Sequence, residues 1–248
     1  MYILLATASC IIGAIIGAAG VGGVLLIPAL MFFGGLSTHE AMATALFSFF
    51  FTGIVGTFIY HRYGSIDWKI TIPVLCSSFF SSYAGAHVNS LSSARLLDSV
   101  LALVIIFSSL YAIFPSAKKA GLTQRRGERG NIGLLLGLGI IIGFICGMTG
   151  AGGGIVSIPV MLIAGYATLP TIATSQALQS IISISGSASN LHNGFVNFSI
   201  VWWVTVCELA GVLIGVRIAH ALPVAKLKKT VTAFCLIIGL IIGVRVFW

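Results

Sequence analysis

Charged residues are scarce in this chain of 248 residues, since Asp, Glu, Lys and Arg make up only 7% of it. Hydrophobic residues make up 58%, whereas ordinary soluble domains are about 25% charged and about 45–50% apolar. So few charges cannot cover a water-exposed surface, which excludes a soluble globular domain. The composition predicts an all-α polytopic membrane protein.

Motifs for catalysis and for cofactor binding are also missing. The pair His39-Glu40 is not followed by the second His of a zinc-protease helix, and no Walker-type loop occurs. The five cysteines lie scattered in apolar segments without metal-ligand spacing. We therefore expect no enzymatic activity, no metal and no cofactor.

The net charge of +8 does not point to nucleic acid. A nucleic-acid groove would need a basic face, whereas the basic residues here are grouped in one loop and at segment ends. The loop holds Lys118, Lys119, Arg125, Arg126 and Arg129. This distribution is typical of orientation charges in membrane proteins, so we expect no nucleic-acid partner.

Eight apolar segments can be recognised, and a polar linker divides them into two groups of four. The segments are roughly 2–35, 40–61, 67–88, 94–116, 132–165, 170–191, 197–218 and 224–247. The predicted organisation is an N-terminal transmembrane repeat (1–117), a basic linker (118–131) and a C-terminal transmembrane repeat (132–248).

The two groups repeat one another. The stretch from Gly20 to Pro28 (GVGGVLLIP) reappears as the stretch from Gly150 to Pro159 (GAGGGIVSIP). Further matches follow in the same order: Ala43-Thr44 with Ala173-Thr174, Gly64 with Gly194, Asp67-Trp68 with Asn197-Phe198, and Gly85 with Gly215. Ordered matches across a whole half indicate an internal duplication.

The first segment of each half is too long for one crossing. Each has 34 residues and would span about 51 Å as one straight helix, whereas the hydrocarbon core is about 30 Å thick. A hairpin of two short helices that meet at a glycine-rich tip fits this length, because glycine supplies the backbone freedom for a reversal. A single steeply tilted crossing is the alternative.

The positive-inside rule favours the hairpin. If each long segment returns to its own side, 11 of the 13 Lys and Arg residues face the cytoplasm, against 8 if it crosses once. Returning hairpins make the halves inverted-topology repeats, each a glycine-broken hairpin followed by three transmembrane helices. The 118–131 loop would then be cytoplasmic and both termini non-cytoplasmic.

The glycine tips are the predicted substrate site. A half-helix begins after each tip, near Val24 and Gly154, and its first amide groups have no intrahelical partner and favour an anion. Close helix packing by glycine is the alternative. The residues expected to bind substrate at the tips are Gly20, Gly22, Gly23, Thr149, Gly150, Gly152, Gly153 and Gly154.

Small polar residues of the following segment extend this prediction. They can bind an oxyanion without adding charge, although interhelical hydrogen bonds would explain them equally well. They are Thr44, Ser48, Thr174, Ser175, Gln176 and Gln179. Since no Lys or Arg lies in the middle of a segment, the pattern favours a weakly held anion of low charge.

Glu208 is the one acidic residue deep within an apolar segment. A carboxylate there is costly unless it is paired or protonated. It is a candidate carrier for a coupling proton, and a structural hydrogen bond to another helix is the alternative. Asp67 follows a loop glycine and is expected to cap the segment that it precedes.

The paired glycine motifs and the loop from Tyr63 to Trp68 (YGSIDW) resemble the TauE/SafE sulfite exporter family, also called the TSUP family. The resemblance covers both halves and implies a transporter of small sulfur-containing anions, such as sulfite or sulfoacetate, in a prokaryotic inner membrane. The second half departs from the pattern at Asn197-Phe198, Gln176 and Gln179.

The sequence thus predicts a secondary transporter in the inner membrane, with a small anion and the lipid bilayer as partners. A passive anion channel and an intramembrane enzyme or scaffold are the alternatives. The substrate, the direction, a coupling proton and a homodimer all stay open.

Overall fold

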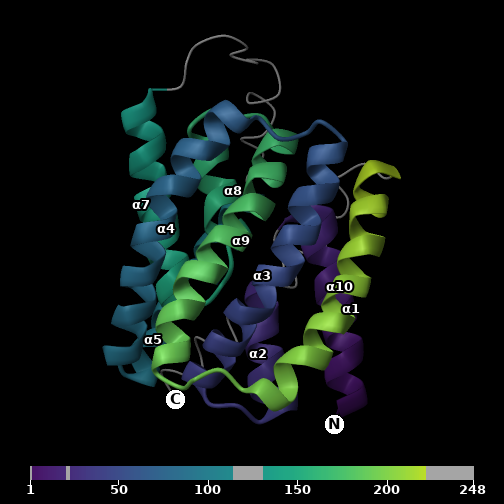
Figure 1. Ribbon diagram of the computed structural model, residues 1–248, viewed down its shortest axis with the longest axis vertical. Coiled ribbons are helices and arrows are strands. Elements are labelled where there is room, and N and C mark those ends of the chain that lie inside the picture. Colours follow the sequence, from purple (N-terminus) through teal and green to yellow (C-terminus); the bar gives the residue numbers. More distant parts are fainter. Residues whose placement is uncertain (1, 21–22, 114–130, 222–248) are drawn as a thin grey trace.

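The computed structural model describes residues 2–20, 23–113 and 131–221, and every element in these ranges is a helix (Figure 1). The helices are α1 (Tyr2–Ala19), α2 (Gly23–Gly34), α3 (Thr38–Arg62), α4 (Trp68–Leu91), α5 (Ala94–Ile113), α7 (Ile132–Thr149), α8 (Gly154–Ile163), α9 (Thr168–His192) and α10 (Phe198–Ala221). Seven of the eight predicted segments are confirmed to within a few residues. The eighth, 224–247, lies outside the described residues, as does the 118–130 part of the linker.

Both long segments consist of two helices, as predicted. The break between α1 and α2 starts at Gly20, and that between α7 and α8 starts at Gly150. Both glycines adopt left-handed backbone angles, with φ of +69° and +66°, which ends a helix without a steric penalty. The first segment folds back on itself, since a Cβ added at Gly34 would lie 3.6 Å from Leu5 Cδ2.

Three pairs of corresponding helices have equal lengths, whereas α2 has 12 residues and α8 has 10. The pair α1 and α7 has 18 residues each, α3 and α9 have 25 each, and α4 and α10 have 24 each. Across the halves, α1 packs along α10, α4 packs along α7, and α3 packs against α9. Glycines such as Gly17 on α1 and Gly147 on α7 face partner-helix backbone directly, the close approach that small residues allow in membrane bundles.

The helix starts are capped in matching ways. Asp67 accepts a hydrogen bond from the Lys69 amide at 3.1 Å at the start of α4, which confirms its predicted capping role. Asn197 accepts from the Ser199 amide at 3.1 Å at the start of α10. The Asp-to-Asn difference between the halves therefore preserves the cap.

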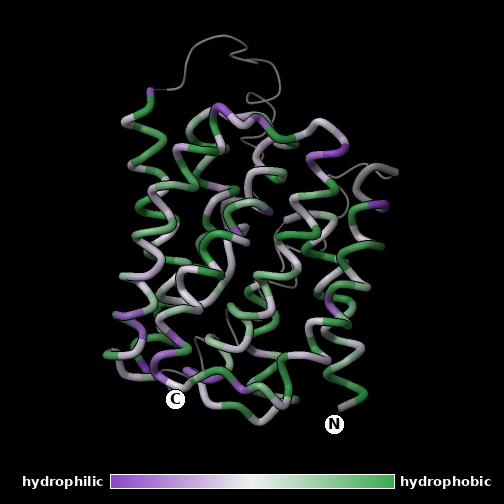
Figure 2. The backbone as a smooth tube through the Cα atoms, in the orientation of Figure 1, coloured by the Kyte–Doolittle hydropathy of each residue, from purple (hydrophilic) through white to green (hydrophobic). Residues whose placement is uncertain are grey.

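The bundle has the apolar surface expected of a membrane protein. Three helical spans in the described ranges are long and apolar enough to cross a bilayer, namely Thr38–Arg62, Ile132–Thr149 and Phe198–Arg217. Large apolar side chains are exposed along the helices, for example Ile3 and Phe80. Hydrophilic residues lie mainly near the two ends of the bundle (Figure 2).

Candidate substrate site at the glycine tips

The two glycine tips meet inside the bundle. Gly23, the first residue of α2, faces the second tip so closely that an added Cβ would lie 3.0 Å from the Ala151 carbonyl oxygen. Both residues are buried. The starts of α2 and α8 are therefore close neighbours in the core, whereas Gly22 lies outside the described residues.

Helix α9 lies against both tips. A Cβ at Gly153 would lie 2.7 Å from the Gln179 amide nitrogen and 2.9 Å from the Ser175 carbonyl oxygen. A Cβ at Gly20 would lie 2.7 Å from Ser175 Oγ. Because these neighbours include backbone atoms of a packed helix, the second tip has no room for a larger residue than glycine at position 153.

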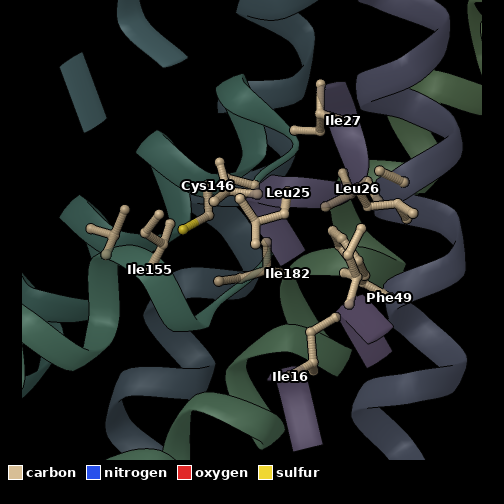
Figure 3. Close-up of a cluster of buried hydrophobic side chains, with 14 of the residues drawn as sticks. Ile16, Leu25, Leu26, Ile27, Phe49, Cys146, Ile155 and Ile182 are labelled. Atoms are coloured by element: carbon tan, nitrogen blue, oxygen red, sulfur yellow. The ribbon is translucent and has the colours of Figure 1, made fainter. Parts of the chain in front are cut away.

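Phe49 of α3 packs between the tips. A Cβ at Gly23 would lie 3.0 Å from Phe49 Cζ, and one at Gly152 would lie 3.1 Å from Phe49 Cδ2. The ring is fully buried, and Figure 3 shows it on α3 within a cluster of side chains drawn from both halves of the chain. Sequence reasoning missed Phe49, since a phenylalanine in an apolar segment carries no signal that separates it from ordinary packing residues.

The two glutamines of α9 connect the tips to other helices. The Gln179 Nε2 donates to Thr52 Oγ1 at 2.9 Å, and the Gln176 Nε2 donates to the Ile16 carbonyl at 3.0 Å. Ile16 lies in the last turn of α1, and its carbonyl also accepts a hydrogen bond from the Gly20 amide at 2.9 Å. The Gln176 Oε1 is buried and has no hydrogen-bond partner among the described residues.

The first turn of α8 carries a second unpartnered polar atom. Its N-cap, Gly153, provides no side-chain hydrogen bond. Ser157 is fully buried, and its hydroxyl finds no partner within the described ranges. Helix side chains tilt toward the N-terminus, which favours a position of this hydroxyl near the tip. The sequence carries one signal for Ser157, because the matching position of the first half holds the apolar residue Leu26.

The other predicted polar residues form hydrogen bonds to neighbouring helices or within their own helix. Thr44 Oγ1 accepts from the Asn197 amide at 3.0 Å, while Thr174 Oγ1 lies 2.8 Å from Thr71 Oγ1. Each threonine thus joins its helix to the start of a neighbouring helix, α10 or α4. Thr149 Oγ1 donates to the carbonyl of Ile145 in its own helix at 2.8 Å.

Two of the predicted tip glycines, Gly150 and Gly154, lie at the two ends of the chain reversal between α7 and α8. Gly150 packs against α3, since an added Cβ would lie 2.7 Å from the Met42 carbonyl oxygen. Gly154 is buried and is the first residue of α8. Their positions agree with the predicted start of the second half-helix.

Glu208 belongs to a separate buried cluster. Its Oε2 accepts a hydrogen bond from Ser48 Oγ, and Thr205 Oγ1 donates to Ser48 Oγ at 3.0 Å. Its Oε1 has no hydrogen-bond partner in the described part of the chain. Ser48 lies on α3 and the two other residues on α10, so the cluster fixes these helices to each other.

A helical bundle with membrane-length apolar spans and irregular backbone buried at its centre defines an integral membrane protein. The profile of the sulfite exporter TauE/SafE family matches residues 5–242. The chain belongs to this family, and with it to a class of membrane transporters.

Curated relatives cover almost the whole chain. YunE of Bacillus subtilis is 24% identical over 96% of this chain and 93% of its own length, and YdhB of the same organism is 26% identical over 92% and 93%. YfcA of Escherichia coli is 26% identical over 93% and 83%. All three are named probable membrane transporter proteins. No solved structure matches the chain.

Proposed function

We propose that this protein is a secondary transporter that moves a small sulfur-containing anion, such as sulfite or an organosulfonate like sulfoacetate, across the inner membrane. The observation that carries the proposal is the contact between the two buried tips, at Gly23 and Ala151. A glycine-broken segment in each half is the best pointer to the substrate site of a repeat transporter. The family's description supplies the sulfur chemistry.

The proposed site binds the anion with helix N-termini and neutral side chains. The starts of α2 and α8 carry partial positive charge, which stabilises a bound oxyanion. From the second half, Ser157 adds a hydroxyl without a partner in the described residues, and Gln179 adds the amide proton that its bond to Thr52 leaves over. Ser175 lines the site beside Gly20 while its hydroxyl donates to the Ile172 carbonyl at 2.7 Å. Phe49 forms an apolar wall from the first half. Thr44, Thr174 and Ser48 bond to residues within or directly before α10 and within α4, and not to the tips, so we assign them to the scaffold around the site.

We further propose that the halves, 1–117 and 132–248, are inverted repeats. If each helix is replaced by its counterpart in the other half, the packed pair α1 and α10 becomes α7 and α4, which also pack against each other. In Figure 1, α3 rises from the lower end of the bundle, whereas α9 descends from the upper end. Rocking of one half against the other would then open the tips to each side in turn.

The basic residues support an orientation. Arg62, Lys69 and Arg217 lie at the end of α3, the start of α4 and the last turns of α10, and these helix ends gather where α7 begins (Figure 1). Arg95 lies in the first turn of α5, at the other end. By the positive-inside rule, the end with Arg62 and Arg217 faces the cytoplasm. The 118–131 loop is then cytoplasmic and the termini are not.

Glu208 is our candidate for the coupling site. An ionisable residue within a membrane helix is by default a candidate functional residue. Glu208 would be protonated in one state and would accept the Ser48 hydrogen bond as a carboxylate in the other, so its protonation would be coupled to the packing of α3 against α10. Cys207, the residue before Glu208 in the chain, is a titratable group that interacts with it electrostatically.

Counterflow in proteoliposomes tests the transport mechanism. Vesicles preloaded with unlabelled anion should accumulate the same labelled anion transiently, using a panel of sulfite, thiosulfate, sulfoacetate, taurine and sulfate. Counterflow with one or two members supports a carrier. Flux without stimulation by internal anion would indicate a channel, and an absence of flux with every member would contradict the proposal.

A further inference from the structure

The ends of α3 and α10 form a groove of about 310 Å³ that the transport proposal does not use. It is lined by Phe58, Ile59, Arg62 and Tyr63 on one side and by Leu213 and Arg217 on the other. The volume is at the lower end of the range for small-molecule pockets. We infer that this groove binds the phosphate headgroup of an anionic phospholipid, with Arg62 and Arg217 as its ligands.

The two arginines give the groove its charge. Both side chains are exposed, and within the described ranges neither guanidinium has a carboxylate partner in an ion pair. A single arginine at a helix end is explained by the negative C-terminal end of the helix dipole. Two arginines from different halves that line one groove call for a shared anion, and guanidinium groups bind phosphate in a bidentate manner.

The apolar residues identify the phosphate as that of a lipid. Phe58 is 55% exposed and Leu213 is 46% exposed, so both offer apolar surface on which the first part of an acyl chain can lie. The Arg62 guanidinium carbon lies 4.9 Å from the centre of the Phe58 ring, a cation–π contact that holds the charge above this surface. A free phosphate would leave Phe58 and Leu213 without a partner.

The depth of the groove matches that of lipid headgroups. Arg62 is the last residue of α3, and Arg217 lies one turn before the last residue of α10, Ala221. The end of a membrane-length apolar span lies at the boundary between hydrocarbon and headgroups. Basic pockets between transmembrane helices at this level bind anionic headgroups. A lipid held there would bridge α3 and α10, which belong to different halves.

The test measures how much phosphatidylglycerol stays bound to the purified full chain. The protein is reconstituted in phosphatidylcholine with a minor fraction of phosphatidylglycerol, and retained lipids are quantified by native mass spectrometry. Arg62→Gln and Arg217→Gln should each lower the ratio of retained phosphatidylglycerol to phosphatidylcholine about fivefold. Arg95→Gln, which removes the same charge at the opposite end, is the matched control and should leave the ratio unchanged.

Three results would overturn the inference. The ratio could stay unchanged in both groove variants, or fall equally in Arg95→Gln, which would indicate a bulk charge effect. Inorganic phosphate could displace phosphatidylglycerol from the wild type, which would make the groove a site for soluble phosphate. Equal unfolding temperatures of all variants in phosphatidylcholine alone verify that each is folded.

Discussion

Helices α3 and α9 occupy matching positions in the two halves but offer different chemistry to the glycine tips. Ala45 and Phe49 on α3 correspond, 130 residues later, to Ser175 and Gln179 on α9. All four residues are buried. The site that we propose is therefore asymmetric, with the first half shaping the space and the second half supplying the hydrogen bonds.

The largest effect should come from closing the second tip. Gly153→Ala introduces a Cβ within 2.7 Å of the Gln179 amide nitrogen, so α8 or α9 must shift. We expect anion transport in proteoliposomes to be lost, while the protein still inserts into the membrane. The control is Gly137→Ala, since a Cβ at Gly137 meets no atom within 4 Å. Normal transport by Gly153→Ala would show that the second tip is not part of the substrate site.

Glu208→Gln should abolish the dependence of transport on pH. The amide keeps a similar shape and can still bond Ser48, but it cannot carry a proton between the two sides. Initial rates are measured over a pH series in the wild type, in Glu208→Gln and in the control Glu40→Gln. Glu40 is the capping-box residue of α3. An unchanged pH profile in Glu208→Gln would assign the carboxylate a structural role.

The asymmetry between the halves predicts a smaller, measurable loss of affinity. Gln179→Leu removes donors from the polar side of the site, and hydrogen bonds to a charged group are worth about 1.5–3 kcal/mol, or about tenfold to a hundredfold in affinity. Titration of the anion with a thermal or fluorescent readout measures the effect. Phe49→Leu, the matched change on α3, keeps the site apolar on that side and should weaken binding less. Equal losses would contradict the division of roles.

The smallest effect is expected at Thr44. Thr44→Val leaves the Asn197 amide without its side-chain acceptor, which costs about 1–3 kcal/mol of stability. The unfolding temperature should fall, whereas transport per folded molecule should stay near the wild-type level. Thr174→Val, which removes the bond to Thr71, serves as the matched change in the other half. A loss of anion affinity in Thr44→Val would show that Thr44 takes part in substrate binding.

Much of the fold could be predicted because the relevant signals are local. Segment length, repeated glycines and the scarcity of charge placed the helices and located both breaks, with Gly20 and Gly150 at the turns. The cap at Asp67 also follows from local sequence. These features depend on a few neighbouring residues and on the thickness of a bilayer, so tertiary contacts are not needed to infer them.

The composition of the site could not be predicted in the same way. Phe49 looks like any apolar residue until α3 is packed against both tips. The hydrogen bond from Ser48 to Glu208 joins residues that are far apart in the chain, and no local pattern couples them. Alignment of the halves does hold one unused signal, namely the polar residues of the second half that replace apolar ones of the first, such as Ser157 for Leu26.

The most direct test of an anion site between the tips is a thermal-shift titration of purified wild type, Gly153→Ala and Gly137→Ala with the anion panel. A bound ligand raises stability by about 2.7 kcal/mol at a hundred times its Kd, which gives a clear shift in Tm. We predict that a small sulfur oxyanion stabilises the wild type and Gly137→Ala but not Gly153→Ala. Equal stabilisation of all three proteins, or of none, would contradict the site.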